Sequence, residues 1–106
     1  MDINIENTTF IIVAYKSEKI IYNCLNSLPD NSIKIVIENS KNLNLKNDLE
    51  RKYKNLTVLL NENSGFGASN NLGIKKCTTQ FAYILNPDVT FQKDTFDNLS
   101  KSCLDI

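Results

Sequence analysis

Histidine is absent from this chain of 106 residues, and its absence removes several kinds of catalytic chemistry. Ser-His-Asp and Cys-His catalysis both need an imidazole, and so do histidine-based metal sites. The three cysteines, Cys24, Cys77 and Cys103, are odd in number, widely spaced and without a CxxC pair. This pattern argues against a disulfide framework and a structural zinc site, so we expect reduced and mostly buried thiols.

Net charge and long apolar runs are also lacking. Twelve basic and twelve acidic residues cancel, so the overall charge gives no indication of a nucleic acid or an anionic membrane as partner. Apolar runs such as residues 10–14 are too short to cross a membrane. Residues 1–4 lack the basic start and apolar centre of a signal peptide. The sequence therefore predicts a cytoplasmic protein.

What is present is typical of one globular domain, which we place at residues 1–106. The composition is 42% hydrophobic and 23% charged, and the length is enough for one modest core. Four short apolar stretches predict buried strands at residues 8–14, 33–37, 56–60 and 81–85.

Helical spacing of apolar residues follows each predicted strand. The first helix begins behind Ser17 as N-cap, the second contains Leu45 and Leu49, and the third covers residues 68–77. A last helix is predicted from Phe96, Leu99, Cys103 and Leu104. The order βαβαβαβα predicts a Rossmann-like α/β/α fold with about four parallel strands and helices on both faces.

Ligands of such sheets bind beyond the carboxyl ends of the strands. The loops there lack the GxxxxGK[ST] pattern, a GxGxxG after the first strand and an acid pair after the first strand. P-loop, dinucleotide-binding and receiver domains are therefore poor matches. A flavodoxin-like domain remains an alternative, although the Ser/Thr-rich phosphate turn expected after its first strand is missing.

Three of these loops carry candidate binding groups. Asp88, held beyond the fourth strand by Pro87, could bind Mg²⁺ or Mn²⁺ through oxygen. The glycine-containing loop at residues 63–67 enters a helix, where backbone N–H groups can meet an anion. Glu38 could accept a hydrogen bond from a base or a ribose. Each also has a purely structural interpretation. Asp88 could belong to a turn that ends a strand, residues 63–67 could form an ordinary βα loop, and Glu38 could be a solvated acid.

Five blocks in order carry a resemblance to a known family. Residues 10–17, 24–28, 36–40, 63–73 and 85–89 together resemble the N-terminal, donor-binding half of family 2 glycosyltransferases with the GT-A fold. The rhamnosyltransferase-like branch is the most similar, and the resemblance covers roughly residues 8–91.

The resemblance implies a site for a UDP-, dTDP- or GDP-linked sugar and an inverting, metal-dependent hexosyl transfer. Glu38 takes the place of the usual Asp at the nucleoside, and Asn70 that of an Arg near the diphosphate. Asn86 and Asp88 replace the DxD motif, with Asp88 as ligand of Mn²⁺ or Mg²⁺. The implied nucleotide-sugar site comprises Ala14, Tyr15, Glu38, Asn63, Gly65, Phe66, Asn70, Asn86 and Asp88. Glu38 is longer than Asp, and Asn86 removes a charge from the metal site.

The family's general base lies in an acceptor-binding half that we do not find here. We assign that role to none of the late acids Asp94, Asp97 and Asp105, and we expect these 106 residues alone to be inactive. The acceptor implied is a glycan or a lipid-linked glycan, in polysaccharide assembly at the inner face of a bacterial membrane. The alternative is a non-catalytic nucleotide-binding or assembly module.

Without later strands, the fourth strand would form an apolar sheet edge. We therefore predict self-association, as a homodimer, through residues 81–85.

Overall fold

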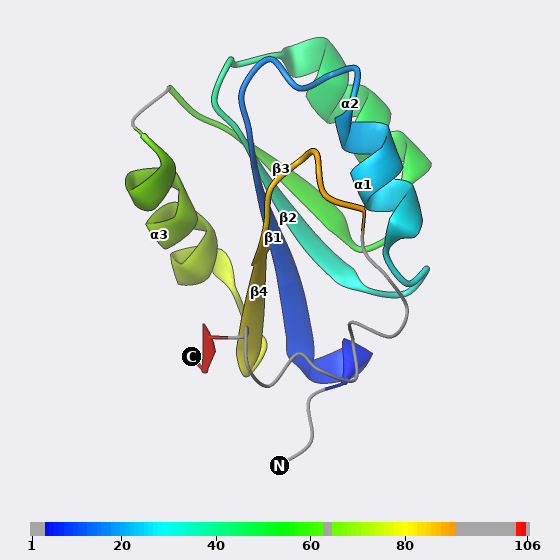
Figure 1. Cartoon of the computed structure of the whole chain (residues 1–106), viewed down its shortest axis with the longest axis vertical. Coiled ribbons are helices and arrows are strands. Elements are labelled where there is room, and N and C mark those ends of the chain that lie inside the picture. The colour runs from blue at the N-terminus through cyan, green and yellow to red at the C-terminus, as the bar shows by residue number, and fades with distance from the viewer. Residues whose placement is uncertain (1–3, 63–64, 91–103, 106) are drawn as a thin grey trace.

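The computed structural model describes residues 4–62, 65–90 and 104–105. Its centre is a sheet of four parallel strands in the order β3-β2-β1-β4 (Figure 1). The strands are β1 (Thr8–Ala14), β2 (Ile33–Glu38), β3 (Leu56–Leu60) and β4 (Phe81–Leu85). The α/β fold and the parallel strands expected from the sequence are confirmed.

Helices cover both faces of this sheet. The helices α1 (Ile21–Ser27) and α2 (Leu43–Lys52) lie on one face, and α3 (Phe66–Lys76) lies on the other (Figure 1). A short 3-10 helix, η1 (Ile5–Asn7), precedes β1. The three α-helices each follow a parallel strand, as the alternating sequence pattern predicted.

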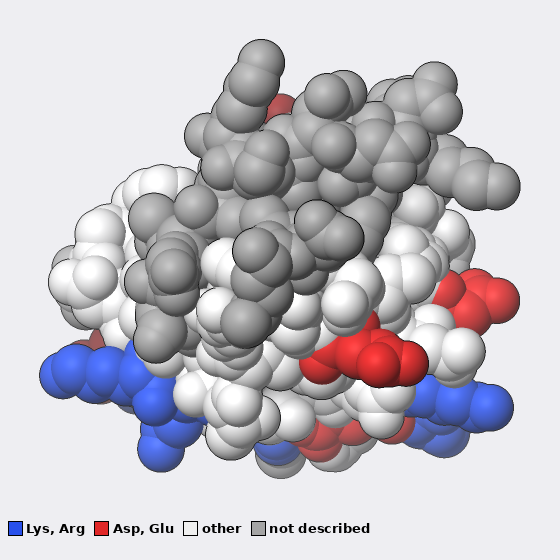
Figure 2. Space-filling view, turned by 90° about the horizontal axis from the view of Figure 1, so that it is seen from below, with Lys and Arg blue, Asp and Glu red and all other residues white. Residues whose placement is uncertain are grey.

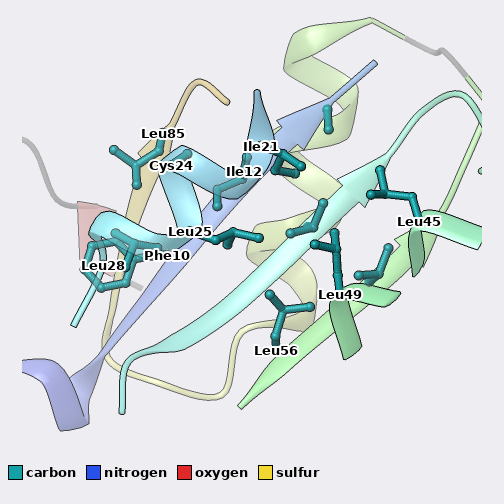
Figure 3. Close-up of a cluster of buried hydrophobic side chains, with 13 residues drawn as sticks. Phe10, Ile12, Ile21, Cys24, Leu25, Leu28, Leu45, Leu49, Leu56 and Leu85 are labelled. Carbon is teal, nitrogen blue, oxygen red and sulfur yellow. The ribbon is translucent and has the colours of Figure 1, made fainter. Parts of the chain in front are cut away.

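The main core lies between the sheet and the helices α1 and α2. Every residue of β1 is buried, and alternate side chains such as Phe10 and Ile12 face these two helices. Figure 3 shows side chains of both helices meeting those of the strands. The helices contribute Ile21, Cys24 and Leu25 from α1, and Leu45 and Leu49 from α2.

The opposite face of the sheet depends on a close approach by α3. A Cβ atom added to Gly73 would lie only 2.6 Å from Cγ2 of Ile11 in β1. The Ile11 side chain is fully buried, so it has little room to move away. Gly73 therefore allows α3 to lie directly on the sheet.

The predicted start of the first helix is wrong. α1 begins at Ile21, and its N-cap is Ile20 without a side-chain cap bond. Ser17 acts through its backbone instead, because its carbonyl accepts hydrogen bonds from the N–H groups of Ile20 and Ile21 at 3.0 and 2.9 Å. Its hydroxyl donates to the carbonyl of Tyr15 at 3.1 Å, so it is used within the loop.

The C-terminal prediction is wrong where the structure can test it. The sequence pattern assigns Leu104 to a helix, but Leu104 lies in β5 (Leu104–Asp105), which pairs antiparallel with Phe81 and Ala82 of β4. The rest of that helix, including Phe96, Leu99 and Cys103, falls outside the described residues. β4 is therefore covered at its first two residues, and self-association through the remainder of its edge stays a prediction.

The thiols are free where they are described. Cys24 is buried and Cys77 is half-buried, and neither forms a disulfide. Cys103 falls outside the described residues.

Two tyrosines join the helices α1 and α2. The hydroxyl of Tyr22 donates to the Asp48 carboxylate, and that of Tyr53 donates to Oδ1 of Asn26 at 2.6 Å. The hydrogen bond to Asp48, burial and the negative charge of Asp48 raise the pKa of Tyr22 to about 12. A pKa raised in the folded state means that the folded protein holds this proton more tightly than the unfolded chain does.

We expect the Tyr22–Asp48 contact to stabilise the protein fully below pH 10 and to lose its effect as the pH rises toward about 12. Urea unfolding at pH 9, 10 and 11 should show a steeper loss of stability in the wild type than in Tyr22→Phe. Tyr15→Phe retains Tyr22 and removes an exposed phenol outside the contact between α1 and α2, so it serves as the control. Equal pH dependence of the wild type and Tyr22→Phe would contradict the assignment.

Candidate functional site

The loops that follow the parallel strands gather at one end of the sheet (Figure 1). A cavity of about 400 Å³ opens there, between α3 and the turn after β4. It is lined by residues of four loops or strand ends: Val13, Tyr15, Ser17, Asn39, Phe66, Asn86, Pro87 and Asp88. Four of the predicted site residues, Tyr15, Phe66, Asn86 and Asp88, are thus brought together from segments far apart in the sequence.

A larger cavity of about 760 Å³ lies near the opposite end of the sheet and contains none of the predicted residues. Its lining includes Glu50, Arg51, Lys52 and Lys54. Figure 2 views the molecule from the end where the strands begin and shows basic and acidic side chains on the same face. This mixture of charges selects no ligand class, so we take the smaller cavity as the candidate site.

Asp88 is presented by a tight turn. The N–H of Val89 donates to the carbonyl of Asn86 at 3.1 Å, which closes the turn around Pro87 and Asp88. The strand residue before it, Leu85, is buried in the main core, whereas Asn86 and Asp88 are exposed. The sequence therefore ends a core strand and places a carboxylate in solvent within three residues.

Two aromatic rings border the same cavity. Tyr15 follows β1 and Phe66 begins α3, and their exposed fractions are 48% and 53%. Exposed aromatic side chains beside a polar cavity can pack against a flat ring or the apolar face of a sugar. Gly65, just before α3, has φ +95°, a conformation that a side chain would disfavour.

Asn39 is a site residue that the sequence reasoning missed. Its Nδ2 donates to Oγ of Ser69 at 2.8 Å, and its Oδ1 accepts from Nδ2 of Asn61 at 3.1 Å. Its backbone N–H donates to the carbonyl of Ala14 at 2.8 Å. Asn39 therefore joins the ends of β1, β2 and β3 to α3, directly beside the cavity. The alternation of side chains along β2, which sends Glu38 and Asn39 to opposite faces, was the available signal.

Glu38 lies away from the residues that line the cavity. It is fully buried on the α2 side of the sheet, where its carboxylate accepts hydrogen bonds from the N–H groups of Ser40 and Asn42 at 3.0 and 2.8 Å. The hydroxyl of Ser40 also donates to it at 2.8 Å. In this structure Glu38 holds the loop that starts α2, and its contact with a nucleotide stays a prediction.

The other predicted residues differ in their surroundings. Ala14 is fully buried and contributes its carbonyl to Asn39. Asn70 lies on the sheet side of α3 with 8% of its surface exposed, and its Oδ1 has no hydrogen-bond partner among the described residues. A buried amide oxygen without a partner is unusual and is available to a donor group or a cation. Asn63 lies outside the described residues.

The cavity lining suits a hard divalent cation better than a soft one. Its possible ligands are oxygens, from the Asp88 carboxylate and the amides of Asn39 and Asn86. Within the described residues, no group of three or more His, Cys, Asp or Glu side chains is placed to hold a metal. Mg²⁺ or Mn²⁺ therefore fits only with further oxygens from a ligand, as a diphosphate would supply.

No helix in the described part of the chain combines the length and the apolar character that crossing a membrane requires.

The parallel sheet and its flanking helices match the GT-A class of glycosyltransferase structures. The sequence model of Glycosyl transferase family 2 matches residues 9–102. The chain therefore belongs to this family. A search of curated proteins gave no match.

Solved structures of one bacterial protein are similar to this chain. Crystal structures of S. aureus TarS 1–349 superpose with a TM-score of 0.70 at 24% identity, over 90% of this chain and 31% of TarS 1–349. The complex of TarS 1–349 with UDP-GlcNAc gives a TM-score of 0.71 at 25% identity and covers 90% of this chain. The complex with UDP gives 0.70 at 24% identity. This chain spans about a third of the length of TarS 1–349.

Proposed function

We propose that this chain forms the donor-binding part of a glycosyltransferase that takes its sugar from a nucleotide-diphospho-sugar. The observation that carries the proposal is the cavity at the carboxyl end of the sheet, which joins Tyr15 and Asp88 from two loops with Phe66 from the start of α3. Family membership and the similarity to TarS, which is solved with UDP-GlcNAc and with UDP, support it. UDP is therefore the nucleotide to test first, before dTDP and GDP.

Different residues of the site would bind different parts of the nucleotide-sugar. Tyr15 and Phe66 offer aromatic surface to the nucleoside or the sugar, and the start of α3 offers backbone N–H groups to the diphosphate. Asp88, with Asn86, would hold Mg²⁺ or Mn²⁺ against the diphosphate. When bound there, a divalent cation would neutralise the negative charge that develops on the leaving nucleoside diphosphate.

The finer assignments belong to this proposal as well. They are the rhamnosyltransferase-like branch, an inverting hexosyl transfer and a glycan or lipid-linked acceptor at the inner face of the membrane. An acceptor hydroxyl must lose its proton to a general base, and we assign that role to no described residue. As the family resemblance implies, we propose that these 106 residues bind the donor without transferring its sugar.

Calorimetric titration of the chain with UDP, dTDP and GDP, each with and without Mn²⁺, tests this proposal. We expect Mn²⁺ to strengthen the binding of one nucleotide, and Asp88→Ala to remove about tenfold or more of that gain, because it removes the carboxylate. Asp30→Ala is the matched control, since Asp30 is an exposed acid near the opposite end of the sheet. A folded chain that binds no nucleotide would overturn the donor-site proposal and favour an assembly module.

A further inference from the structure

Cys24 connects the core to the turn that carries Asp88. It lies in the middle of α1, is fully buried, and its neighbours in the main core include Leu85. Figure 3 labels both residues within this cluster. The thiol of Cys24 donates to the backbone carbonyl of Asn86, with Sγ and O 3.8 Å apart.

The carbonyl of Asn86 is also the acceptor that closes the turn. It receives the N–H of Val89 at 3.1 Å as well as the thiol of Cys24. One oxygen atom is thus shared by the turn and by α1. The side chains of Asn86 and Asp88 are exposed to solvent. The bond from Cys24 to the Asn86 carbonyl therefore holds the turn from the side of the core.

The position of the thiol favours this hydrogen bond. The Cys24 side chain is fully buried, so its S–H group is shielded from solvent where it meets the carbonyl of Asn86.

We propose that Cys24 is a positioning residue, whose thiol holds the Asn86 carbonyl and so keeps Asp88 at the cavity. The inference rests on the proposed function, because it gives Asp88 the role of metal ligand. Cys24 acts through the turn and touches neither nucleotide nor cation.

The first test compares nucleotide binding with and without metal. Cys24→Ala should weaken binding of UDP in the presence of Mn²⁺ about three- to tenfold, the range expected for one lost hydrogen bond. Binding of UDP without metal should change less than twofold. Cys24→Ser retains a donor and should recover part of the loss. Ile21→Val removes a buried methyl group from the same helix and core, and it should leave both affinities unchanged.

A second test needs no ligand and so separates this inference from the proposed function. Amide hydrogen exchange reports the N–H of Val89, which donates to the carbonyl of Asn86. Exchange at Val89 should become faster in Cys24→Ala, and it should stay as in the wild type in Ile21→Val. In one outcome, the wild type binds no UDP while exchange at Val89 still responds in this way. The proposed function is then wrong, but the positioning of the turn by the hydrogen bond from Cys24 to Asn86 is confirmed.

The inference is overturned by either of two results. One is unchanged exchange at Val89 in a folded Cys24→Ala variant. The other is an equal loss of metal-dependent binding in Ile21→Val, which would show that any loosening of this core has the same effect. Circular dichroism of each variant establishes that the fold is retained.

Discussion

Replacing Glu38 by alanine is expected to lower the free energy of unfolding by about 2–3 kcal/mol, the range for lost hydrogen bonds to a buried charged group. The substitution leaves the N–H groups of Ser40 and Asn42 without their carboxylate acceptor. It also leaves an empty space beneath the loop that starts α2. Urea unfolding followed by circular dichroism measures the change directly.

Two further variants separate this structural role from nucleotide binding. Glu38→Gln retains the shape of the side chain but weakens acceptance of two N–H groups, so we expect a smaller loss of stability than for alanine. Glu62→Ala is the control, because Glu62 is an exposed acid whose partner is Lys41 at the surface. If Glu38→Gln stays as stable as the wild type and instead loses affinity for UDP, then Glu38 contacts the nucleotide as the family resemblance implied.

Replacing Gly73 by alanine is expected to destabilise the protein by about 1–2 kcal/mol, since overpacking against Ile11 outweighs the gain in helix propensity. The new Cβ would lie 2.6 Å from a γ-methyl group that is fully buried, so α3 must move away from β1. Thermal and urea unfolding of the variant test this expectation.

A second glycine in the same helix provides the opposite result. A Cβ atom added to Gly67 would have nothing within 4 Å, and the residue is exposed, so Gly67→Ala should stabilise the protein slightly. Ile11→Val shortens the side chain that faces Gly73 but retains Cγ2, and it should therefore rescue Gly73→Ala only in part. A stabilised Gly73→Ala variant would show that α3 does not depend on this close approach.

The strands were predictable because each is a short, mostly apolar stretch, and β1 is buried on both faces. The sequence of β1 shows no sustained alternation of apolar and polar residues, which is typical of a central parallel strand. In the structure all seven of its residues are buried. Helix ends were harder to place, because backbone groups rather than side chains set the start of α1. Ser17 has the side chain of a typical N-cap, yet its carbonyl receives the helical N–H groups.

The candidate site was predictable at the level of loops and less so at the level of single side chains. Ligands of parallel sheets bind beyond the carboxyl ends of the strands, which predicted that Tyr15, Phe66, Asn86 and Asp88 lie at one end of the sheet. All four residues line the cavity. The direction of each side chain depends on the parity of its position in the strand. Glu38 and Asn39 are neighbours in sequence, but one faces α2 and the other faces the cavity. β5 could not be predicted, because its two residues carry no periodic pattern.

The central position of β1 has a consequence for how the chain acquires its structure during synthesis. Thr9 pairs with Ile33 of β2 on one side, but on the other side its partner is Ala82 of β4. During synthesis β1 therefore leaves the ribosome before both of its partner strands, and β4 follows much later than β2. Pairings so distant in sequence slow folding and leave apolar edges exposed in the meantime. The nascent chain must hold β1, β2 and β3 with one side of β1 open until β4 arrives, and an open apolar edge of this kind favours aggregation.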